Sequence, residues 1–136
     1  MNVAVRYYTR SGNTEKLAKG IAEAIGVTAA NVAVPLEERA DILFLGCSYY
    51  AFDVDPNVKK YICDNKQKIE KIVCFGTSAM MKSVYKPMKK VAEEYGVEIE
   101  KEDFHCHGSF GPMHKGRPNA EDISKAQQFA KRILSQ

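Results

Sequence analysis

The sequence lacks tryptophan, has only four cysteines, and contains no stretch of about 18 consecutive apolar residues. Without such a stretch the chain offers no candidate for a membrane-spanning helix, and we expect no membrane association. The segment 1–6 also lacks the basic start and the long apolar run of a signal peptide. No two cysteines form a CxxC pair, so buried thiols are favoured over a disulfide framework. These absences predict a cytoplasmic protein.

The composition fits one soluble domain that spans residues 1–136. Of the 136 residues, 45% are apolar and 27% are charged, with 9 glycines and 5 prolines, which is ordinary for a globular domain. A chain of this length buries about two-thirds of its unfolded surface when it folds. We therefore expect a core that needs neither disulfides nor a metal.

The formal net charge is +3, but the positive charge is concentrated in one segment. Between Lys59 and Lys90 there are nine lysines against only Asp64 and Glu70, whereas the segments on either side each sum to −2. Such a surplus can attract an anionic partner or a nucleic acid. Lysines on the outer faces of helices are more often solvated surface, and we expect no nucleic-acid binding.

Apolar residues alternate along the chain between strand-like and helix-like spacing. Strand patterns occur at 3–8, 27–34, 42–46, 72–75 and 97–99, and the runs 42–46 and 72–75 read as strands buried on both faces. Helical spacing occurs at 14–25, from Pro56, at 84–95 and from about 119. Gly26 predicts the end of the first helix, and Asp55 with Pro56 predicts the start of the second.

Five strands that alternate with helices predict an α/β fold, a three-layer doubly wound sandwich with a parallel sheet. In such a sheet, ligands bind in the crevice beyond the carboxyl ends of the strands. The loops 9–14, 48–55 and 76–83 and the segment after Phe104 should therefore converge on one site.

The loop that follows the first strand has the composition of a phosphate site. The segment 9–14 reads Thr-Arg-Ser-Gly-Asn-Thr, with hydroxyls, an amide and one glycine at the start of a helix. The N–H groups and the dipole at a helix N-terminus stabilise a dianion, and the side chains can donate further hydrogen bonds. The loop is neither a Walker loop nor a GxGxxG turn. A plain capped helix start is the alternative interpretation.

Residues 5–18, Val-Arg-Tyr-Tyr-Thr-Arg-Ser-Gly-Asn-Thr-Glu-Lys-Leu-Ala, resemble the flavodoxin signature, in which this loop holds the phosphate of FMN. The resemblance extends over the whole chain and implies a five-stranded sheet of order 2-1-3-4-5. The segment 116–119, followed by Asp122, also resembles small proteins of the flavodoxin family.

The resemblance implies a set of FMN-binding residues in three loops. The phosphate would contact Thr9, Arg10, Ser11, Gly12, Asn13 and Thr14; the second flavin loop matches Ser48, Tyr49, Tyr50 and Ala51; the third matches Thr77, Ser78, Ala79 and Met80. Tyr50, and after it Tyr49, is the candidate to stack on the isoalloxazine ring. Packing of the loop onto the core is the alternative for either tyrosine, and flexible packing is the alternative for Met80.

The chain departs from the flavodoxin pattern in three respects. The second loop, 48–55, contains no glycine, although flavodoxins usually have one there whose peptide reorients on reduction. The third loop offers Ala79 and Met80 in place of a stacking aromatic residue, which favours an open ring face. Flavodoxins are strongly acidic, and this chain is not, so their usual docking with basic partners is not expected here.

His105, Cys106 and His107 are the candidates for a metal site, together with His114. Consecutive residues of an extended segment point to alternating sides, so we expect no metal there. A loop near the mouth of the crevice is the favoured interpretation of 106–108.

We therefore expect an FMN-binding redox protein that transfers electrons between redox partner proteins or to a small electron acceptor, as a monomer or homodimer and with no catalytic residue of its own. The alternatives are a small FMN-dependent reductase of the quinone or NAD(P)H type, and a flavin-free interaction module on the same fold. A response-regulator receiver is excluded because Tyr8-Thr9 and Cys47-Ser48 stand where its acidic residues belong. A CxxxxxR phosphatase is excluded because no cysteine is followed by arginine at that spacing.

Overall fold

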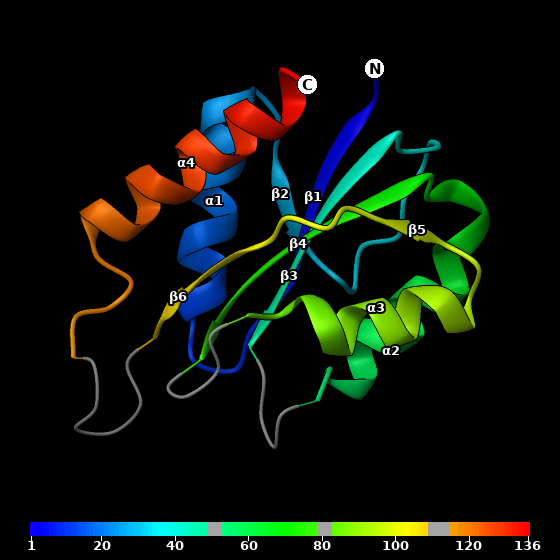
Figure 1. Ribbon diagram of the computed structural model, residues 1–136, viewed down its shortest axis with the longest axis horizontal. Helices are drawn as coiled ribbons and strands as arrows, with labels where there is room; N and C mark the ends of the chain where they lie inside the picture. Colours follow the sequence, from blue (N-terminus) through cyan, green and yellow to red (C-terminus); the bar gives the residue numbers. More distant parts are fainter. Residues whose placement is uncertain (49–52, 79–82, 109–114) are drawn as a thin grey trace.

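The computed structural model describes residues 1–48, 53–78, 83–108 and 115–136 (Figure 1). The strands are β1 (Val3–Tyr8), β2 (Ala29–Asn31), β3 (Ile42–Ser48), β4 (Lys71–Ser78), β5 (Glu98–Ile99) and β6 (Phe104–His107). The helices are α1 (Asn13–Ile25), α2 (Pro56–Asn65), α3 (Tyr85–Glu94) and α4 (Ala120–Leu134), and a 3-10 turn, η1, covers Lys66–Lys68.

All strand pairs of the sheet are parallel. The strand order is β2-β1-β3-β4-β5, with β6 also paired to β4. The central strands β1, β3 and β4 lie in continuous register, for example Val5 beside Phe44 and Phe44 beside Val73. The α/β doubly wound class and the order 2-1-3-4-5 are thereby confirmed.

Helices cover both faces of the sheet, as Figure 1 shows, with α1 and α4 on one face and α2 and α3 on the other. Residues of β3 alternate between the two cores: Phe44 packs with α1 and α4, whereas Leu43 and Leu45 pack with α2 and α3. All three side chains are fully buried. The run 42–46 is apolar because helices cover β3 on both faces of the sheet.

The fifth position of the sheet differs from the single edge strand that the sequence predicts. Two short strands, β5 and β6, both pair with β4. Between the pairs Ile72–Ile99 and Phe75–Phe104, β4 advances by 3 residues and its partner by 5, so two extra residues loop out. The carboxylate of Asp103, in this loop, accepts a hydrogen bond from the backbone N–H of Val84 before α3. The looped-out segment between β5 and β6 thus connects the edge of the sheet to the start of α3.

The ends of the helices follow the sequence signals. Gly26 ends α1 in the left-handed conformation with φ 78°, which glycine adopts without strain. The Asp55 carboxylate accepts a hydrogen bond from the backbone N–H of Asn57, with Pro56 at the first helical position of α2. Within the residues that the structure describes, no helix combines the length and the apolarity that crossing a membrane requires.

Candidate functional site at the carboxyl ends of the strands

The turn between β1 and α1 is held by its own hydrogen bonds. The Thr9 hydroxyl accepts a hydrogen bond from the backbone N–H of Gly12 at 2.9 Å. Gly12 has φ 87°, a conformation that side-chain-bearing residues rarely adopt. The backbone of the turn is therefore fixed at its first and last residues, and Gly12 sets the direction in which α1 begins.

The phenol of Tyr7 connects the strand before the turn to the helix after it. Its hydroxyl donates a hydrogen bond to the Glu15 carboxylate, and this bond raises the pKa of Tyr7 to about 12. The phenol therefore stays protonated and the bond persists through the neutral pH range. This hydrogen bond thus joins β1 to the first turn of α1 across the loop between them.

The N-terminus of α1 is built differently from those of α2 and α4. The N-cap residue of α2 is Asp55 and that of α4 is Asn119, and each side chain accepts a hydrogen bond from its own helix. The N-cap residue of α1 is Gly12, which has no side chain and makes no capping hydrogen bond. The N-cap residue therefore supplies no side-chain acceptor at the positive end of the α1 dipole. A bound anion can take this place.

A buried pair of hydroxyls joins α1 to the end of β4. Thr14 and Thr77 are 0% and 2% exposed, and their Oγ1 atoms lie 3.0 Å apart. Gly108, which follows β6, packs against Asn13 and Thr77 beside this pair. A Cβ atom there would lie 2.8 Å from Nδ2 of Asn13 and 3.1 Å from Cβ of Thr77. Three segments distant in sequence thus meet beside the turn, and the absence of a side chain at Gly108 is what allows their approach.

An ion pair ties the turn to the end of the second predicted flavin loop. The Arg10 guanidinium lies 2.9 Å from the Asp55 carboxylate, whose side chain is 2% exposed. The hydrogen bond to Asp55 raises the pKa of Arg10 above its ordinary value, so the cation is present at every physiological pH. Because Asp55 also caps α2, it positions the only cationic side chain of the turn.

The structure brings together several of the residues that the sequence predicts. Thr9, Arg10, Ser11, Gly12, Asn13 and Thr14 form the turn and the first residues of α1, and Thr77 lies beside them. Ser48 and Ser78 end β3 and β4, and Ser48 is in register with Thr77. The remaining predicted residues, Tyr49, Tyr50, Ala51, Ala79 and Met80, lie outside the described residues. Their contacts with the ring stay predictions.

Sequence reasoning missed two contributions to this site. The sequence indicates Asp55 only as a helix cap, because nothing local links it to Arg10, 45 positions earlier. The role of Gly108 is packing against Asn13 and Thr77. A glycine directly after the last apolar strand was the available signal, since it marks a close approach of backbone to another segment.

The histidines near the crevice lie on one side of β6. The ring centroids of His105 and His107 are 6.3 Å apart, whereas Cys106 is buried in the core against α1 and α4. Burial lowers the pKa of His105 below its ordinary value. In the four described ranges, no three side chains of the His, Cys, Asp or Glu type come together as metal ligands.

Comparison with known proteins identifies a sequence relative and solved structures that share the fold. No protein-family model matches the chain. An uncharacterized protein of Methanocaldococcus jannaschii is 30% identical to this chain in an alignment that covers 90% of each of the two chains. The structure of a flavodoxin from the domain Archaea superimposes with a TM-score of 0.76 at 17% identity, over 99% of this chain and 97% of the other. This chain belongs to one family with the Methanocaldococcus protein and has the flavodoxin-like fold.

Further solved structures share the flavodoxin-like fold. Oxidised flavodoxin 1 of Bacillus cereus has a TM-score of 0.70 at 20% identity, over 99% of this chain and 98% of the other. Rubredoxin oxygen:oxidoreductase of Desulfovibrio gigas has a TM-score of 0.71 at 16% identity, over 98% of this chain but 36% of the larger protein. The fold thus occurs both as a separate protein and as a part of a larger one.

Proposed function

We propose that this flavodoxin-like protein binds FMN, with the phosphate at the turn 9–14, and acts as a redox protein that passes electrons between partners. The observation that carries the proposal is the N-terminus of α1, which begins at a glycine N-cap that makes no side-chain capping hydrogen bond. It lies where the sheet order changes direction between β1 and β3, the position at which doubly wound sheets bind ligands.

The residues of the turn fit a phosphate dianion. Amides at the start of α1 and the hydroxyl of Ser11 can donate to its oxygens, and Arg10 supplies a positive charge that Asp55 holds beside the turn. The buried Thr14–Thr77 pair and Gly108 keep the neighbouring segments in place. Such preorganisation raises affinity because less freedom is lost on binding.

Bound FMN would supply the redox chemistry, and the protein would supply its position and surroundings. Ser48 and Thr77 are in register at the carboxyl ends of the adjacent parallel strands β3 and β4, so the segments 48–51 and 77–80 both begin at the crevice edge. We propose that they contact the ring, with Tyr50 or Tyr49 as the stacking residue that excludes water from one ring face.

The test compares FMN with riboflavin, which has the same ring but no phosphate. Fluorescence titration of the purified protein should show FMN binding at least tenfold tighter than riboflavin, and only FMN should raise Tm strongly. Equal affinity for the two flavins, or no binding of either, would refute the proposed phosphate site. A stepwise anaerobic reduction of the FMN-loaded protein, followed by visible absorbance, then separates one-electron carriage from two-electron reductase activity.

A further inference from the structure

The helices α2 and α3 have an unusual distribution of charge along their length. Neither has an acidic residue in its first turn or a basic residue in its last turn. Their lysines lie toward the start and their carboxylates toward the end: Lys59, Lys60 and Asp64 in α2, and Lys86, Lys89, Lys90, Glu93 and Glu94 in α3. In α4 the order is the reverse, with Glu121 and Asp122 in the first turn and Lys131 and Arg132 in the last.

The helix dipole does not account for the charges at the two ends of α3. The helix dipole favours acidic residues at the N-terminus and basic residues at the C-terminus by about 0.3–1 kcal/mol for each well-placed charge. Lys86, in the first turn of α3, and Glu94, its last residue, both oppose the dipole. The charges of α4 follow it. The position of Lys86 therefore has no explanation in the dipole of its own helix.

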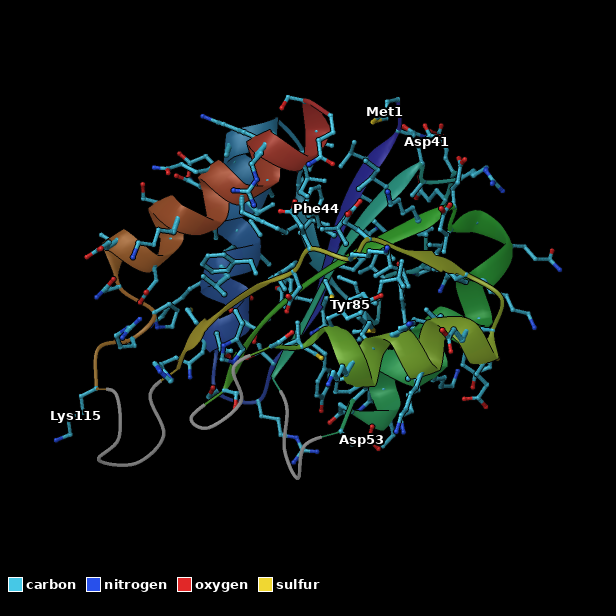
Figure 2. All side chains as sticks on the ribbon, viewed as in Figure 1. Met1, Asp41, Phe44, Asp53, Tyr85 and Lys115 are labelled. Carbon is cyan, nitrogen blue, oxygen red and sulfur yellow. The ribbon has the colours of Figure 1, made fainter. Side chains whose placement is uncertain are left out.

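The lysines gather at the edge of the sheet where the candidate site lies. Because α2 and α3 follow β3 and β4, both helices start beyond the carboxyl ends of these strands. Asp53 marks this edge, and Figure 2 shows it beside α2 and α3. Its carboxylate lies 3.1 Å from Nζ of Lys59, and the hydrogen bond from Lys59 lowers its pKa, with a smaller contribution from the charge of Lys90. The two helices thus contribute positive charge to one place.

We define the basic rim as Lys59, Lys60, Lys86, Lys89 and Lys90. All but the half-buried Lys59 are exposed. Lys60 pairs with Asp64 and Lys89 with Glu93 across one helical turn. Among the described residues, no carboxylate forms an ion pair with Lys86 or Lys90. The rim therefore retains positive charge that its own chain does not neutralise.

We propose that the basic rim is the docking surface for an acidic electron-transfer protein. The redox nature of this partner rests on the proposed function, whereas its charge follows from the rim itself. Complementary charge steers diffusional encounter and fixes the orientation of docking. The helices of the rim follow β3 and β4, which end at Ser48 and Ser78 on the edge of the sheet where the site is proposed, so a partner seated on the rim would be close to that edge.

The shape of the charged area favours a compact acidic patch over a nucleic acid. Asp64, Glu93 and Glu94 lie behind the rim on the same two helices, and they would repel a polyanion that continued along the surface. The ring of Tyr85 is half-buried and has the Nζ atom of Lys89 at 5.9 Å from its centroid, whereas single-stranded nucleic acids use aromatic rings that are open to stacking bases. The acidic patch of a globular protein needs to contact only the rim.

The experiment measures the binding of a fluorescently labelled acidic [2Fe–2S] ferredoxin to the full chain by anisotropy, with and without FMN. At an ionic strength of about 0.01 M, where charges act over roughly 30 Å, the ferredoxin should bind, and at about 0.2 M binding should be largely lost. The double variant Lys86→Glu/Lys90→Glu should bind at least tenfold more weakly. Its Tm should change little, because the carboxylate at position 86 suits the helix dipole, while the carboxylates at positions 86, 90 and 94 repel one another across each helical turn.

The control variant is Lys101→Glu/Lys131→Glu, which makes the same charge change at exposed lysines before β6 and in α4 that, like Lys86 and Lys90, form no ion pair among the described residues. It should keep most of the ferredoxin affinity. Equal losses in the two variants, or no ferredoxin binding at low salt, would overturn the docking proposal. So would an oligo(U) RNA that binds the rim at a salt concentration where ferredoxin does not.

Titration with FMN separates this proposal from the proposed function. The rim variant should bind FMN as the parent does, since none of its positions lies in the turn or the flavin loops. Rim-dependent ferredoxin binding by a chain that does not bind FMN would support docking and refute the flavin. If the chain bound FMN but its affinity for ferredoxin did not depend on the rim, the flavin proposal would be supported and the docking proposal refuted.

Discussion

Replacing Gly12 with valine should weaken FMN binding by more than tenfold. Gly12 has φ 87°, and a Cβ atom there would meet nothing within 4 Å. The cost is therefore backbone strain, about 1–2 kcal/mol for the left-handed region and more for a β-branched residue. The turn can relieve this strain only by leaving the conformation that aims the first amides of α1 at the phosphate. A tenfold loss of affinity corresponds to about 1.4 kcal/mol.

The matched control is Gly26→Val at the other end of the same helix. Gly26 has φ 78°, and a Cβ atom there would also meet nothing within 4 Å. Both variants should therefore lose a similar free energy of unfolding, with Tm lower by roughly 5 °C. Only Gly12→Val should lose FMN affinity in a fluorescence titration. If both variants lost affinity equally, or if Gly12→Val kept it, the turn would not be the anchor of the phosphate.

Two further predictions concern stability. Gly46→Ala should lower the free energy of unfolding by at least 1–3 kcal/mol in urea titrations, because the added Cβ atom would lie 2.3 Å from the Phe75 ring across β3 and β4. Phe75→Leu should recover part of this loss in the double variant, and a simple sum of the two losses would contradict the clash. The Arg117 hydrogen bond holds the pKa of Asp122 below its ordinary value. The stability that this bond contributes is present above the unfolded pKa of about 3.9 and is lost as the pH falls toward the folded pKa. Asp122→Asn should reduce the acid dependence of Tm, whereas an unchanged slope would refute the assignment.

Much of the fold follows from features that lie within a few residues of one another. Alternation of apolar runs with helical spacing specifies the strands and helices, since each pattern matches one local geometry. Gly26 and Asp55 mark helix ends by the same local logic, and both act as predicted. The Thr-Arg-Ser-Gly-Asn-Thr turn is likewise a continuous segment between a strand and a helix. Its residues are therefore enough to predict a phosphate site.

The sequence alone does not reveal the interrupted edge of the sheet. The sequence predicts a strand only at 97–99, and the division into β5 and β6 depends on which residues of β4 the segment 98–107 pairs with. An edge strand has one neighbour and fewer ladder hydrogen bonds, so pairing tolerates two looped-out residues there. The hydrogen bond from the backbone N–H of Val84, before α3, to the Asp103 carboxylate also depends on this loop.

By itself the sequence determined the alternation of elements, the ends of the helices and the chemistry of the turn, because each depends on neighbours in the chain. Only the tertiary structure decided that Arg10 meets Asp55, that Thr14 meets Thr77, and that Gly108 closes on both Asn13 and Thr77. The first two pairs are 45 and 63 positions apart, and no local pattern encodes which of many polar residues will meet. Parallel strand pairing brings them to one edge of the sheet, and the packing of α1 and α2 against opposite faces sets their distances.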